Sequence, residues 1–137
     1  MIKIEAILDK DGVLRACKAE GHAGAGKTGT DIVCAAVSVL LRTALITLSN
    51  RKGVVVRGGA PKSGQLWLEA DYDTDGKDFL FACGVFLLDG LGSIEQEYPK
   101  NCSLNIIVFI FFLYWLYIIA KNCDKTWIKR FAINCNI

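Results

Sequence analysis

The chain has 137 residues, which is enough for one domain with a modest hydrophobic core. Its 16 basic and 14 acidic residues give a net charge of +2, a balance that does not suggest a nucleic-acid-binding protein. One histidine and six cysteines, with no Cys-x-x-Cys spacing, cannot complete a Cys/His zinc site, so we expect neither a metal nor a cofactor.

The first predicted element is a β-hairpin. Residues 2–8 and 13–19 alternate apolar and polar side chains with the period of a strand, and the sequence DKDG at 9–12 is typical of a turn. A strand at the start of the sequence is not a signal peptide, and the apolar contexts of Cys34 and Cys83 suit reduced, buried thiols. We therefore expect a cytoplasmic protein.

A glycine-rich loop and a long apolar helix follow the hairpin. Residues 21–29 contain four glycines, which predicts a mobile loop. Residues 32–48 are almost entirely apolar and form a run too long for a typical strand, so we expect a helix with Asp31 as its N-cap. Gly53 is a suitable residue to follow the end of this helix.

The second half of the domain repeats the pattern of two strands and a helix. Residues 54–57 and 66–72 are predicted strands, and residues 78–98 are a predicted helix that Pro99 ends. Residues 103–108 suit a last strand. The order β-β-α-β-β-α-(β) predicts an α+β, two-layer fold, with an antiparallel sheet and both helices on one of its faces.

The C-terminal sequence differs in kind from the rest. Residues 106–120 are an unbroken apolar run, and Lys121 and further basic residues follow it. The run is shorter than the ~20 residues that a membrane span needs, so we do not expect a membrane protein. We divide the chain into a domain at 1–108 and a tail at 109–137, and we interpret the tail as a read-through or frameshifted extension.

The segment GHAGAGKTGTDIVCAA, residues 21–36, contains two candidate active-site signatures. Its first eight residues, from Gly21 to Thr28, match the phosphate-binding pattern G-x-x-x-x-G-K-T. That pattern requires a buried parallel strand before it and a helix directly after it. Here the preceding strand is solvated and Gly29 follows the motif. Nucleotide binding is therefore the weaker of the two interpretations.

The second signature pairs His22, the only histidine, with Cys34. A thiolate is the reactive form of cysteine, and a position in the first turn of a helix favours that anion. His22 would act as the base that removes the thiol proton. On composition alone, the alternative that Cys34 is a core residue and His22 a solvated turn residue is favoured.

Two strings around these residues resemble the ribosomal-processing cysteine protease (Prp) family. They are GHAG at 21–24 and GTDIVCAAVS at 29–38, and the later GL at 90–91 and EYP at 97–99 resemble the family's terminal helix. The resemblance covers residues 1 to about 108. It implies a homodimeric α+β endopeptidase that removes the N-terminal extension of protein twenty-seven of the large ribosomal subunit during ribosome assembly.

The resemblance also assigns roles to individual residues. Cys34 would be the nucleophile and His22 the general base, so the phosphate-loop match would be an accident of a glycine-rich substrate loop. Early N–H groups of the helix near Cys34 would stabilise the oxyanion. The hinges of the loop would be Gly21, Gly24 and Gly29.

Four further residues have less direct roles. Asp31 is a candidate to orient His22, although a role as helix cap is favoured. Ser38 lies one turn after Cys34 and either lines the site or bonds to the helix backbone. Cys17 and Cys83 are expected to be structural.

The partners follow from the same resemblance, and two other functions remain open. We expect a ribosomal-protein precursor as substrate and no direct contact with nucleic acid. An apolar first helix cannot bury both of its faces on one small sheet, which independently favours a dimer. The alternatives are a non-catalytic, ribosome-associated binding module and a nucleotide-binding protein that uses the loop from Gly21 to Thr28.

Overall fold

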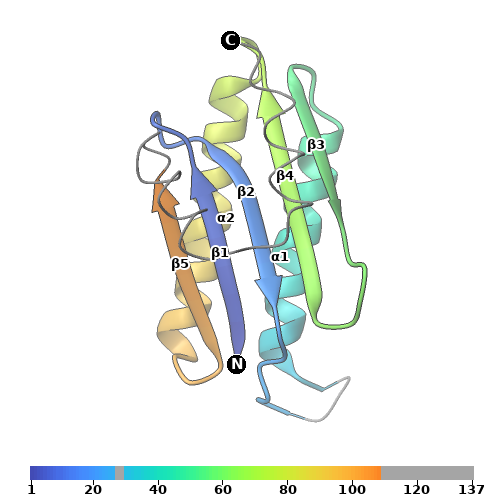
Figure 1. Ribbon diagram of the computed structural model, residues 1–137, viewed down its shortest axis with the longest axis vertical. Coiled ribbons are helices and arrows are strands. Elements are labelled where there is room, and N and C mark those ends of the chain that lie inside the picture. The colour runs from blue at the N-terminus through green and yellow to red at the C-terminus, as the bar shows by residue number, and fades with distance from the viewer. Residues whose placement is uncertain (27–29, 109–137) are drawn as a thin grey trace, which may run out of the picture.

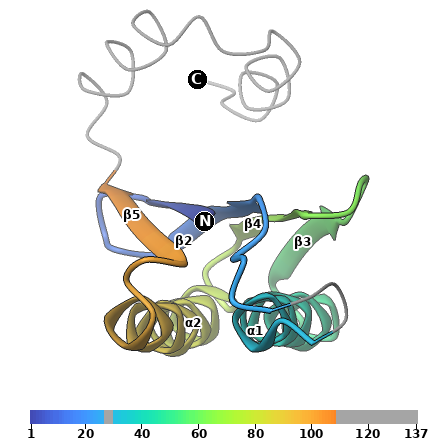
Figure 2. The same cartoon turned by 90° about the horizontal axis from the view of Figure 1, so that it is seen from below.

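The structure is a computed structural model that describes residues 1–26 and 30–108. Its elements are β1 (Ile2–Leu8), β2 (Leu14–Glu20), α1 (Ile32–Ser49), β3 (Val54–Gly59), β4 (Gln65–Tyr72), α2 (Lys77–Glu97) and β5 (Cys102–Val108). The strands form one sheet, and both helices lie on the same face of it (Figures 1 and 2). The predicted α+β class and element order are confirmed. Loop residues 27–29 and the predicted tail at 109–137 lie outside the described residues.

The strand order is β3-β4-β2-β1-β5, and three of the four neighbouring pairs are antiparallel. The fourth pair, β1 with β5, is parallel from Ile2↔Cys102 to Leu8↔Val108. β4 is antiparallel to β2 and therefore runs in the direction of β1. Because α2 carries the chain back along the sheet, β5 starts at the same end as β4, as in other helical crossovers. The sheet is thus mixed. The prediction of an antiparallel sheet is correct for three pairs and wrong for β1 with β5, the pair at one edge of the sheet.

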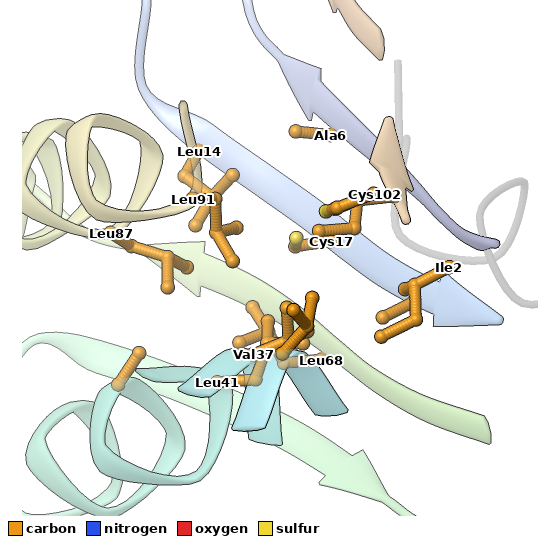
Figure 3. Close-up of a cluster of buried hydrophobic side chains, with 14 of the residues drawn as sticks. Ile2, Ala6, Leu14, Cys17, Val37, Leu41, Leu68, Leu87, Leu91 and Cys102 are labelled. Carbon is orange, nitrogen blue, oxygen red and sulfur yellow. The ribbon is translucent and has the colours of Figure 1, made fainter. Parts of the chain in front are cut away.

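The hydrophobic core lies between the sheet and the two helices (Figure 3). Each helix buries residues three or four positions apart, which places them on one face. On α1 they are Val33, Val37, Leu41, Ala44 and Leu48, and on α2 they are Leu80, Gly84, Leu87 and Leu91. The sheet contributes Ile4 and Leu68, both 1% exposed, to the same cluster as Leu41 and Leu87. Burial of these stripes fixes both helices on the sheet.

α1 is unusually apolar for a helix of a small domain. Its 18 residues have a mean hydropathy of 2.1, so the helix is long and apolar enough to cross a membrane by length and composition alone. The buried stripe accounts for one face of this helix as part of the core. The outer face leaves Ile32, Val39 and Ile46 between 59% and 63% exposed.

A pair of valines on α1 tests this assignment of faces. Val37 is 3% exposed, and its replacement by Ala should lower the free energy of unfolding by about 2 kcal/mol, because buried methyl groups are lost and a cavity remains. The same substitution at Val39, which is 63% exposed, should change that free energy by less than about 0.5 kcal/mol. Urea unfolding of both variants measures the difference, and equal losses would contradict the burial pattern of α1.

Candidate active site

One end of the sheet gathers the residues that the sequence singled out. β1 begins there, β2 ends there, the β3–β4 turn lies beside them, and α1 starts close by (Figure 1). A cleft of about 590 Å³ at this end is lined by His22, Asp31, Cys34 and Ser38. Gly21 and Gly24 also line it, whereas the third predicted hinge, Gly29, lies outside the described residues. The fold therefore brings the described candidates into one cleft.

Asp31 caps the helix that carries Cys34. It has extended backbone angles (φ −77°, ψ 102°), and its Oδ1 accepts a hydrogen bond from the Cys34 N–H at 3.0 Å. Its Oδ2 accepts a second hydrogen bond from the Ala25 N–H at 3.2 Å. The bond from the Cys34 N–H is the main reason that the pKa of Asp31 lies below its ordinary value. Asp31 is therefore a carboxylate that joins the loop to the start of α1, which is the capping role favoured by the sequence.

Cys34 lies in the first turn of α1 and is partly exposed to the cleft. The Ala23 N–H donates a hydrogen bond to Cys34 Sγ at 3.3 Å. A backbone N–H and the positive end of a helix both favour negative charge at a neighbouring atom. The surroundings of this sulfur thus suit a nucleophilic thiolate.

His22 is exposed and lies next to Ala23, in the segment between Gly21 (φ 101°) and Gly24 (φ 67°). Its imidazole packs against Gly64 in the β3–β4 turn, where an added Cβ would lie 2.8 Å from Nε2. The Gly21 N–H donates to the Gly64 carbonyl at 2.8 Å, which ties the segment to that turn. Within residues 1–26 and 30–108, no hydrogen bond is found between the imidazole and Cys34. Such bonds often form only when the substrate is bound.

The other cysteines that the structure describes do not line the cleft. Cys17 is 1% exposed, and its burial raises the pKa of the thiol to about 12. Burial likewise raises the pKa of Cys83 and of Cys102, and Glu95 adds to the effect at Cys102. These thiols are held in the protonated, unreactive form, in keeping with the structural role expected for Cys17 and Cys83.

Three residues of this site were missed by the sequence analysis. Ala23 contacts the sulfur, Gly64 contacts the imidazole, and Asn101 Nδ2 donates to the Ala23 carbonyl at 2.8 Å. Gly64 and Asn101 are distant from the loop in sequence. The β3–β4 hairpin and the parallel β1–β5 pair bring them to it, so no local pattern indicates their role.

The geometry does not favour a phosphate-binding loop. β2, which precedes the glycine-rich segment, is antiparallel to both of its neighbours, whereas phosphate loops follow a parallel strand. Asp31 already supplies an anionic partner to an N–H at the start of α1. Among the described residues, no group of three or more His, Cys, Asp or Glu side chains is placed to hold a metal ion.

Comparisons with known proteins identify the family and the fold of the chain. The family model for cysteine protease Prp matches residues 1–103. Three solved structures share the fold. The essential ribosomal processing protease Prp from S. aureus, in complex with a covalently linked product peptide, has 24% identity and a TM-score of 0.68 over 77% of this chain and 99% of that one. The same S. aureus protease with a substrate peptide has 23% identity and a TM-score of 0.64 over the same shares, 77% and 99%.

SMU.848 from Streptococcus mutans has 26% identity and a TM-score of 0.65 over 80% of this chain and 96% of that one. No protein with a curated description matches the sequence significantly. The family model covers well over half of the sequence, including both strings around His22 and Cys34. The chain therefore belongs to the cysteine protease Prp family.

Proposed function

We propose that this protein is an endopeptidase that uses Cys34 and His22 to remove the N-terminal extension of a large-subunit ribosomal protein, protein twenty-seven, during ribosome assembly. The observation that carries the proposal is the bond from the Ala23 N–H to Cys34 Sγ, in a cleft that His22 also lines. The substrate class is supported by the S. aureus relative, a ribosomal processing protease crystallised with a substrate peptide. We propose that this activity is cytoplasmic, which is the location expected for such a substrate.

The proposed chemistry begins at the sulfur of Cys34. The thiolate attacks the scissile carbonyl carbon, and His22 holds the thiol proton. The C–N bond then breaks, His22 transfers its proton to the leaving amine, and the N-terminal fragment remains on Cys34 as a thioester. Water activated by the same imidazole hydrolyses the thioester and restores the thiol.

The oxyanion of the tetrahedral intermediate needs a donor near the sulfur. The sequence suggested the early N–H groups of the helix. Two of these already have partners, since the Cys34 N–H donates to the Asp31 carboxylate and the Ala35 N–H donates to the Asp31 carbonyl at 3.0 Å. The Ala23 N–H donates a hydrogen bond to the sulfur itself. In the tetrahedral intermediate the oxyanion is bonded to the carbon atom that the sulfur has attacked, so it would lie close to the same N–H. We assign oxyanion stabilisation to Ala23.

Replacement of either proposed catalytic residue should stop cleavage of a peptide that spans the ribosomal extension. With the full chain, Cys34→Ala should leave no measurable cleavage, and His22→Ala should lower kcat/KM by about 10²- to 10⁴-fold, because proton transfer is lost. Peptide cleavage followed by mass spectrometry measures both effects. Cys83→Ala, at a thiol outside the cleft, is the matched control and should cleave normally. Normal cleavage by Cys34→Ala would contradict the proposal, and ribosome binding by that variant without any wild-type cleavage would favour the binding module.

We further propose that the protein acts as a homodimer. The outer face of α1 is apolar, and α2 beside it exposes Phe81, Val85 and Phe86 by 42% to 71% (Figure 2). Two adjacent helices with apolar outer faces form a surface that a second copy of the chain would cover by the same residues.

Phe86, at 71% exposure, tests the dimer without disturbing the core. Phe86→Glu should convert the dimer to a monomer in sedimentation equilibrium, because a carboxylate would be buried between two apolar faces. Val55→Glu introduces the same charge at a residue of β3 that is 60% exposed, next to buried Val54 and so on the sheet face away from the helices, and it should leave the mass unchanged. A wild-type chain that sediments as a monomer at micromolar concentration would contradict the dimer.

A further inference from the structure

Ala23 is held at three separate points. Its side chain is 3% exposed and belongs to the core. Its carbonyl accepts the hydrogen bond from Asn101 Nδ2 at 2.8 Å, and its N–H donates to Cys34 Sγ at 3.3 Å. The carbonyl of the preceding residue, His22, accepts a hydrogen bond from the Met1 ammonium at 2.7 Å. The carbonyls of His22 and Ala23, on either side of the N–H that donates to the sulfur, therefore both accept a hydrogen bond.

Asn101 is itself fixed by the sheet. It directly precedes β5, and its carbonyl accepts the N–H of Ile2, the first residue of β1, at 2.8 Å. Its own N–H donates to the Tyr98 carbonyl at 2.9 Å, at the end of α2. The next residue, Cys102, is fully buried. The side chain of Asn101 therefore extends from a rigid junction of β1, β5 and α2 toward the loop.

The loop, by contrast, has a backbone that can turn. Gly24 follows Ala23 with φ 67°, and Gly21 lies two residues before it with φ 101°. Glycine populates such angles and their mirror images about equally, so the local sequence does not fix the direction of the Ala23 N–H. The Ala23 N–H shares one planar peptide group with the His22 carbonyl, and the Ala23 carbonyl belongs to the next peptide group. Because the Ala23 side chain is buried, a donor on the Ala23 carbonyl limits the rotation between these two groups, and the N–H then keeps its direction.

We propose that Asn101 is a positioning residue for Cys34: its side-chain amide holds the Ala23 carbonyl so that the Ala23 N–H points at Sγ. The bond stabilises negative charge on the sulfur and, in the reaction, on the oxyanion next to it. The inference rests on the proposed function only in taking Cys34 as the nucleophile. Asn101 acts through Ala23, and it does not line the cleft.

Alkylation of Cys34 by iodoacetamide tests the inference without any substrate. In the full chain, Asn101→Asp and Asn101→Ala should slow alkylation of Cys34 at neutral pH by about three- to tenfold, the range expected for one ordinary hydrogen bond. The rate should rise at a higher pH than in the wild type and reach a plateau at least as high, because a thiolate that is less stabilised is also the stronger nucleophile. Asn105→Asp, the same change at an exposed position of β5, is the matched control and should leave the profile unchanged.

Peptide mapping of the same samples reports on the fold. Cys102 adjoins Asn101 and is buried, so its continued protection shows that the junction is intact. An unchanged pH profile of Cys34 in both Asn101 variants would overturn the inference. Slow alkylation of Cys34 together with exposure of Cys102 would also overturn it, because it indicates a general structural role. A failure of the wild type to cleave the ribosomal peptide would count against the proposed substrate and would leave the alkylation result valid.

Discussion

The hydrogen bond from the Ala23 N–H to Cys34 Sγ is the contact on which the account of this site depends. It joins two segments that the chain brings together from different directions, the turn after β2 and the first turn of α1. Each segment is fixed by a separate polar side chain, since Asp31 caps the helix and Asn101 holds the carbonyl of Ala23. The sulfur thus lies between a rigid helix start and a loop residue that is fixed at both ends.

The fold explains why the segments that make this contact meet at one end of the sheet. Burial of one stripe of α1 places that helix along the sheet, so its N-terminus lies where β2 ends. The parallel pairing of β5 with β1 then brings Asn101 to the same end, next to the start of β1. The second consequence follows from the crossover through α2, which returns the chain to the end of the sheet from which β4 began. The site therefore depends on a local interaction, the Asp31 cap of α1, and on a long-range one, the pairing of β5 with β1.

Much of this arrangement could be predicted from sequence. Most of the features that could not be predicted share one physical cause, the choice of neighbouring strands in the sheet. Alternation in residues 2–8, the apolar run after Asp31 and the cap itself are local signals, and they indicated the hairpin, α1 and the position of Cys34 in its first turn. The direction of β5, the contact of Gly64 with His22 and the bond from Asn101 depend on which strands become neighbours. Periodicity carries no information on that choice. The cap predicted at Asp31 already implies that its carboxylate accepts the Cys34 N–H, whereas the approach of the Ala23 N–H to Sγ depends on how the loop folds back onto α1.

Capture of the acyl-enzyme is the measurement that tests the central claim most directly. An activated ester of the N-terminal extension peptide should acylate the nucleophile faster than water removes the acyl group, so that an acid quench traps the intermediate. Intact-mass and peptide-mapping mass spectrometry of the full chain should then find one acyl group, located on Cys34. Turnover of the ester with no adduct on any cysteine, or with the acyl group on Cys17, Cys83 or Cys102, would contradict the assignment of Cys34 as the nucleophile.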